Sequence, residues 1–159
     1  MDKFLVIHKL NIPKEVKKDR VFSIDCGTAI VGRAILDKKY NNLENVASGA
    51  IMTSKDNDMS LRLKQIFGEL NDLIKLYSPT VMAIEDLFYF KNKKTVISVS
   101  QARGVIMLSG TINGLPVHNY TPLQVKSAVT GYGRAEKDQV AFMIGKILKL
   151  TDIPKLDDI

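Results

Sequence analysis

The stretch RVFSIDCGTAIVGRAILD, residues 20–37, restricts the fold of this chain more than any other part of its sequence. An apolar run from Val21 ends in the acid Asp25, and a second run, from Val31 to Asp37, follows after the short turn CGT. Two apolar runs of strand length joined by a short turn predict two neighbouring antiparallel strands. The first of them carries a carboxylate at its carboxyl end.

The rest of the chain alternates between short apolar runs and amphipathic stretches at helical spacing. Further strands are expected at 45–53, 80–87 and 115–120, and helices at 59–77, 95–112, after the N-cap Thr121 and at 136–150. The order βββαβαβα, with one more helix at the end, predicts an α/β domain with a mixed five-stranded sheet flanked by helices. We expect one domain over residues 21–159, preceded by an extension, 1–20, to which the sequence assigns no role.

Composition narrows the setting of this domain. The net charge of +6 suits a nucleic-acid partner, although it also suits a solvated surface. One cysteine excludes an intramolecular disulfide and a zinc site built from cysteines. The apolar run near the start, Phe4 to Ile7, is too short for a secretory signal, and no run approaches the length of a membrane span. A reducing, cytoplasmic location is therefore expected.

Acids end two of the predicted strands, Asp25 the first and Glu85 the fourth. If these strands are neighbours, the two carboxylates meet at one edge of the sheet, which is unfavourable unless a cation lies between them. Oxygen ligands without histidine or cysteine suit Mg²⁺ or Mn²⁺. The alternative is that the acids are separate, one capping a turn and the other pairing with a lysine.

Several stretches in one order make the chain resemble the RuvC family of Holliday-junction resolvases. They are SIDCGTAIVGRAILD, AIEDLFYFKN, SQARGVIM, PVHNYTPLQVKSAVTGYGRAEKDQV and IPKLDD. The resemblance implies an RNase H-like fold, a homodimer, and symmetric nicking of four-way DNA junctions in recombination and repair. It further implies two Mg²⁺ ions per active site, with Mn²⁺ as a substitute, and a branch-migration complex as a partner.

The resemblance also implies roles for individual residues. Asp25 matches the first catalytic acid, which would bridge both metals, and Glu85 matches the second. Asp158 matches the first acid of a C-terminal pair, with Asp157 beside it. The lysines that would face the scissile phosphate are Lys126 and Lys137.

Aromatic and basic residues are the candidates for DNA contacts. Phe88 falls where the family places an aromatic wedge against junction bases, and Tyr89 is the reserve. Arg103 could reach DNA or a partner subunit, or brace the fold through an ion pair. The remaining candidates for phosphate contacts are Lys91, Lys93, Lys94 and Arg134.

The sequence departs from the family pattern at two sites. Cys26 stands where the family usually has proline, so a redox-sensitive thiol beside the metal is one interpretation. The family's last acid is expected about three residues beyond Asp158, and the sequence ends at Ile159. We therefore expect the domain to lack the end of its C-terminal helix and the chain to cut weakly if Ile159 is its true end.

Three other functions stay open on the sequence alone. The DCGT turn also resembles the phosphate-binding turn of actin-like ATPases and sugar kinases, but those proteins close two such lobes around a nucleotide and 159 residues suffice for one. A non-cleaving junction-binding protein and an RNase H-like nuclease that acts on RNA are the other two. Junction binding without metal, compared with nicking in Mg²⁺, separates these possibilities.

Overall fold

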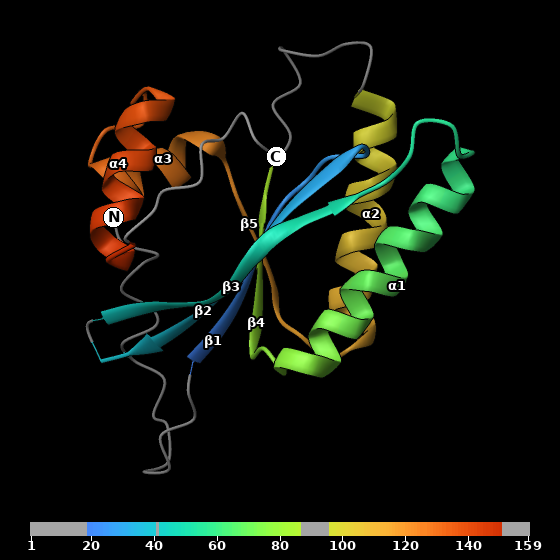
Figure 1. Ribbon diagram of the computed structural model, residues 1–159, viewed down its shortest axis with the longest axis horizontal. Helices are drawn as coiled ribbons and strands as arrows, with labels where there is room; N and C mark the ends of the chain where they lie inside the picture. Colours follow the sequence, from blue (N-terminus) through green and yellow to red (C-terminus); the bar gives the residue numbers. More distant parts are fainter. Residues whose placement is uncertain (1–18, 41, 87–95, 151–159) are drawn as a thin grey trace.

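The computed structural model describes residues 19–40, 42–86 and 96–150, and it confirms the predicted order of strands and helices. Within those ranges the strands are β1 Asp19–Asp25, β2 Ile30–Lys39, β3 Asn42–Met52, β4 Val81–Glu85 and β5 Val117–Tyr120. The helices are α1 Met59–Tyr77, α2 Val96–Ile112, α3 Pro122–Thr130 and α4 Lys137–Leu148. Helices α1 and α2 cover one face of the sheet, and α3 and α4 lie on the other side (Figure 1).

The sheet order β3-β2-β1-β4-β5 places the first and fourth strands side by side. Strands β1, β2 and β3 pair antiparallel, which confirms the predicted pairing of the first two strands, whereas β4 runs parallel to β1 and β5 runs parallel to β4. In the register of β1 and β4, Ile24 lies opposite Ile84. The next residue on each strand is an acid, so parallel pairing brings Asp25 and Glu85 to the same edge of the sheet.

The hydrophobic core lies between the sheet and the helices α1 and α2. Side chains alternate between the faces of a strand, and the alternate residues Phe22 and Ile24 of β1 are buried in this layer. Helix α2 approaches the sheet closely at Gly110, where a methyl group would lie 2.9 Å from Sδ of Met82 and from Cγ2 of Val117. This close approach explains the glycine near the C-terminal end of α2.

Strand boundaries differ from the predicted ones because polar residues at strand ends pair across the sheet. Strand β1 begins at Asp19 rather than Val21, and β2 continues past Asp37. Arg20 and Asp37 are cross-strand partners, and Nε of Arg20 donates to Oδ1 of Asp37 at 2.6 Å. Hydropathy alone does not show that a buried aspartate has an arginine partner.

The predicted start of α3 is confirmed in detail. The Thr121 hydroxyl accepts a hydrogen bond from the backbone N–H of Gln124, and the Gln124 side chain accepts one from the backbone N–H of Thr121. Pro122 occupies the first helical position, where its missing N–H costs nothing. This cap fixes the entry of α3 directly after β5.

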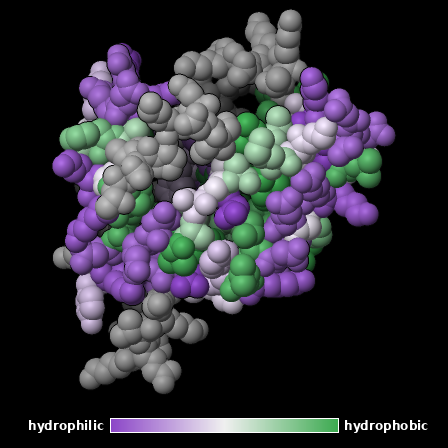
Figure 2. Space-filling view, viewed as in Figure 1, coloured by the Kyte–Doolittle hydropathy of each residue, from purple (hydrophilic) through white to green (hydrophobic). Residues whose placement is uncertain are grey.

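Figure 2 shows hydrophilic residues over both helical flanks, with hydrophobic patches between them. Across the described ranges, no helix combines the length and hydrophobicity needed to cross a lipid bilayer.

Candidate active site

Asp25 and Glu85 form the centre of the site, each as the last residue of its strand. Asp25 is exposed, and its side chain lies across its cross-strand partner Gly32, where a methyl group would be 3.3 Å from Cβ of Asp25. Glu85 is half-buried. Burial, then the negative charge of Asp25 and a hydrogen bond between the two carboxyls, raise the pKa of Glu85 above its usual value. The predicted meeting of two carboxyls is therefore present.

Hydrogen bonds from Thr53, directly after β3, hold the turn after Asp25, and Arg62 of α1 supports Thr53. The Thr53 hydroxyl donates to the backbone oxygen of Thr28 at 2.6 Å, and the backbone N–H of Thr53 donates to Ala29 at 2.9 Å. Nε of Arg62, on α1, in turn donates to the Thr53 hydroxyl at 2.8 Å. The turn is also sterically restricted, because a Cβ at Gly27 would lie 1.9 Å from the backbone oxygen of Ile30.

Lys126 is the basic residue that the structure links to the acids. It lies on α3, and its ammonium donates to the backbone oxygen of Ala135 at 2.6 Å. Its positive charge opposes the rise in the pKa of Glu85, so it acts on the carboxyl pair. Lys137, the first residue of α4, and Arg134 in the preceding turn are both exposed.

Arg103 has its partners inside the fold. Nη2 of Arg103 donates to Oδ1 of Asp86 at 2.5 Å and to Oδ1 of Asn119 at 2.9 Å. Three roles were open for this residue on sequence grounds. The ion pair favours a role within the fold over the predicted DNA contact, because the guanidinium is held between β5 and the end of β4.

Cys26 directly follows Asp25, and the charged groups of the site act on its thiol. Burial, together with the negative charges of Asp25, Glu85 and Asp86 and against a lowering effect of Arg103, raises the pKa of its thiol to about 12. A protonated thiol is a poor nucleophile. The environment therefore does not favour the redox-sensitive role, and Cys26 serves as a small apolar side chain in the turn.

The other predicted site residues fall outside the described ranges. These are the acids Asp157 and Asp158 and, between β4 and α2, the residues Phe88, Tyr89, Lys91, Lys93 and Lys94. In the described residues alone, no group of three or more His, Cys, Asp or Glu side chains could hold a metal ion. The two acids that do meet there offer only carboxylate oxygens, which are the donors that Mg²⁺ and Mn²⁺ prefer. This donor set fits a hard divalent cation.

Sequence reasoning missed the supporting residues Thr53, Arg62, Asp86 and Asn119. Asp86 stands next to Glu85 in the motif IED, and this adjacency was the one signal that could have indicated it. The contacts of Thr53 and Arg62 produce no periodic pattern in the sequence.

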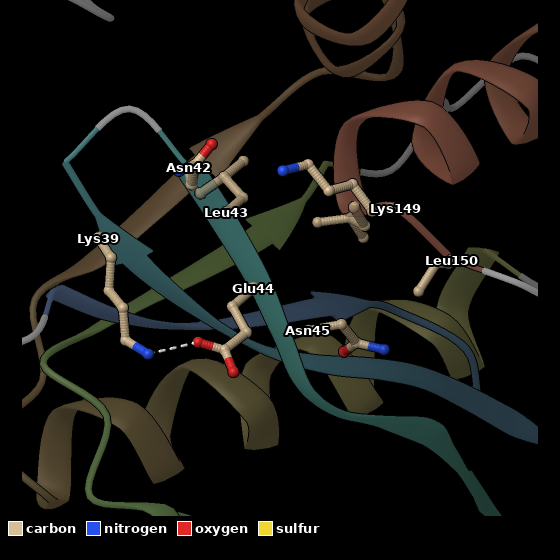
Figure 3. A pocket seen from close by; sticks show the side chains of 8 residues that line it. Lys39, Asn42, Leu43, Glu44, Asn45, Lys149 and Leu150 are labelled. Atoms are coloured by element: carbon tan, nitrogen blue, oxygen red, sulfur yellow. Dashed lines mark hydrogen bonds and ion pairs between the residues drawn. The ribbon is translucent and has the colours of Figure 1, made fainter.

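A shallow groove of about 390 Å³ lies at the opposite end of the sheet, between the β2–β3 hairpin and the end of α4 (Figure 3). Lys39 lines it and donates to Glu44 at 2.6 Å, while Lys149 projects from the other side. The neighbouring Lys38 pairs with Asp19 at the start of β1, whereas Asp25 ends that strand. This groove is therefore separate from the acidic site.

Comparison with known proteins agrees with this geometry. The family model described as crossover junction endodeoxyribonuclease RuvC matches residues 21–159. The RuvC of Fusobacterium nucleatum is 54% identical over 139 residues, which are 87% of this chain and 73% of that protein. The RuvC of Caldanaerobacter subterraneus is 47% identical over 140 residues, 88% of this chain and 85% of that protein.

Solved structures give the same result. The Thermus thermophilus RuvC structure superposes with a TM-score of 0.78 at 27% identity, covering 86% of this chain and 84% of that one. The same protein in complex with a Holliday junction substrate gives a TM-score of 0.80 with 86% and 83% coverage. The yeast mitochondrial resolvase Ydc2, at 13% identity and a TM-score of 0.64, shares the fold. The predicted RNase H-like fold is confirmed.

Proposed function

Because the chain belongs to the RuvC family of crossover junction endodeoxyribonucleases, we propose that its Asp25–Glu85 edge is the active site of a nuclease that resolves four-way DNA junctions. The observation that carries this proposal is the parallel pairing of β1 with β4, which brings together two acids separated by 59 residues in the sequence (85 − 25 − 1). Ligands of α/β folds generally bind at the carboxyl ends of such strands.

Asp25 and Glu85 would hold divalent cations at this edge, and the fit of their oxygens to hard ions supports two Mg²⁺ ions, with Mn²⁺ as a substitute. Asp158, with Asp157 beside it, is proposed to complete the ligand set. The chemistry that such ions supply is activation of a water and stabilisation of the leaving oxygen. The exposed Asp25 and the half-buried Glu85 present their carboxylates to one approaching phosphodiester.

Lys126 is proposed to hold the scissile phosphate. Its ammonium, fixed by the hydrogen bond to Ala135, opposes the rise in the pKa of Glu85, so its positive charge acts at the edge where a phosphate would enter. Lys137 is proposed to add a second positive charge. Substrate contacts are also proposed for Arg134, in the turn before α4, and for residues of the segment between β4 and α2, namely Phe88, Tyr89, Lys91, Lys93 and Lys94. A nuclease that acts on DNA junctions agrees with the cytoplasmic location expected from the sequence.

Symmetric nicking needs two active sites related by a two-fold axis, so we propose a homodimer. Helix α2 supports this, because Ile97, Leu108 and Ile112 on it are 72%, 52% and 62% exposed. Gly104 on the same helix has open space above it. A branch-migration complex is proposed as the partner of the dimer.

A gel assay tests the function. The full chain is incubated with a labelled four-way junction or with a linear duplex of the same sequence, in Mg²⁺ or in EDTA. We expect binding of the junction under both conditions and paired nicks in Mg²⁺ only. Binding without nicking would favour the non-cleaving alternative, and equal affinity for both DNAs would reject structure-specific recognition.

A further inference from the structure

The guanidinium of Arg103 spans the ends of two strands beside the acidic site. Its Nη2 donates both to Asp86, which directly follows β4, and to Asn119 of β5. Asn119 is the register partner of Ile84, and Glu85 follows Ile84. One side chain from α2 therefore ties the end of β4, which carries Glu85, to the neighbouring strand β5.

Arg103 itself is anchored. Its helical neighbours Ala102 and Ile106 are fully buried in the core, so the stem of Arg103 leaves a fixed helix. The side chain is 23% exposed and that of Asp86 is 36% exposed, so water screens the pair only in part. The backbone N–H of Asp86 also donates to Tyr120 at 2.8 Å. The residue after Glu85 is thus fixed through both its backbone and its carboxylate.

The Nε atom of Arg103 is in an environment that is unfavourable for stability. Nε is buried and has no hydrogen-bond partner among the described residues. A buried unsatisfied donor is unfavourable for stability, and more so on a charged group. A stabilising brace would be expected to satisfy this donor, whereas a side chain selected for where it holds its neighbours can leave it unpaired.

We propose that Arg103 is a positioning residue for Glu85: through Asp86 and Asn119 it fixes the end of β4, and with it the direction in which the Glu85 carboxylate faces a bound cation. The inference rests on the proposed function of the Asp25–Glu85 edge. Partners that orient a metal ligand typically contribute about 10–100-fold to metal affinity or activity. Arg103 would supply this contribution without touching DNA.

The test is a charge-neutral double substitution, Arg103→Gln with Asp86→Asn, which removes the ion pair without changing the net charge. Its matched control is Arg20→Gln with Asp37→Asn, since that pair joins the opposite end of β1 to β2. Binding of Mn²⁺ alone is measured from the electron paramagnetic resonance signal of the free ion. Junction affinity is measured in EDTA, and thermal unfolding is measured without metal.

We expect the Arg103/Asp86 variant to bind Mn²⁺ about tenfold more weakly, to nick more slowly by a similar factor at subsaturating metal, and to bind junctions within twofold of wild type. Excess metal should restore most of the nicking rate. The Arg20/Asp37 control should lower the unfolding temperature and leave Mn²⁺ affinity unchanged. Arg103→Lys, which keeps one donor and the charge, should recover part of the Mn²⁺ affinity.

Two outcomes would overturn the inference. Unchanged Mn²⁺ affinity with weaker junction binding would make Arg103 a DNA-contact residue. Unchanged Mn²⁺ affinity with only a lower unfolding temperature, as in the control, would make it a structural brace. If wild-type protein bound no Mn²⁺ and cut no junction, the proposed function itself would have failed, and that result is distinguishable because it appears before any variant is made.

Discussion

Asp25 leans over Gly32, its partner on β2, so closely that a methyl group there would lie 3.3 Å from Cβ of Asp25. Paired Cβ atoms on antiparallel strands are usually about 4.5–5.5 Å apart. A side chain at Gly32 would therefore have to displace Asp25 by a few tenths of an ångström. Gly32 on β2 thus belongs to the site, although it carries no functional group.

Gly32→Ala should displace the Asp25 carboxylate by a few tenths of an ångström. Because misplacement of a reacting group by about 1 Å can cost about 10²-fold, we expect nicking to fall by about tenfold with junction affinity unchanged. Gly68→Ala is the control, since a Cβ there has nothing within 4 Å. A single-turnover nicking assay compares the two, and equal rates would show that Asp25 does not depend on Gly32.

Asp25→Asn should abolish metal-dependent nicking, because the amide removes a negative oxygen ligand from the proposed cation site. Junction binding should stay the same or tighten, since a negative charge facing the phosphates is lost. Asp72→Asn on α1 changes the net charge equally at an exposed position. Normal cutting by Asp25→Asn, measured on a sequencing gel, would disprove the proposed site.

Lys126→Ala should reduce nicking more than binding. The ammonium acts on Glu85 and is fixed by Ala135, so its charge is placed for the reacting phosphate rather than for the duplex arms. Positive charges placed at a reacting phosphate typically contribute several kcal/mol, so a loss of about 10²-fold or more in nicking rate is expected. Lys75→Ala, in the last turn of α1, controls for net charge. Equal losses of rate and affinity would instead indicate a phosphate contact in the arms.

The parts of this site that sequence could predict are those with a local pattern. Asp25 and Glu85 end apolar runs, and Thr121 with Pro122 forms a recognisable helix start, so these two strand ends and the start of α3 were predicted correctly. The contact between Arg103 and Asp86 joins residues 17 positions apart on different elements, and it depends on how α2 packs against the sheet. Hydrophobic periodicity reports which face is buried, but it does not specify which polar groups meet at the end of that face.

Thr53→Val should loosen the turn that follows Asp25. The substitution keeps the side-chain shape but removes the hydroxyl that donates to Thr28 and accepts from Arg62. Leaving buried partners unsatisfied typically costs about 1–3 kcal/mol, so the free energy of unfolding should fall by about that amount. Urea unfolding measures this loss, and nicking should decline with it. Ser54→Ala is the control, because Ser54 is exposed and its hydroxyl bonds only locally to Asp56.

Leu108→Glu should separate the proposed dimer. Leu108 lies on the outward side of α2 with Ile112 one turn further along, and half of its surface is exposed in the single chain. A charge placed there would be buried without a partner on association, which is strongly unfavourable, whereas in a monomer it would face water. Light scattering at high micromolar concentration should therefore report a dimer for wild type and a monomer for the variant, with unchanged unfolding temperature at low concentration.

The variant should also lose paired nicks on opposite strands, because two sites would no longer act on one junction. Leu76→Glu, at a more exposed position near the end of α1, should leave the dimer intact. A wild-type monomer at high micromolar concentration would contradict the proposed dimer through α2 and, with it, the symmetric cutting of junctions.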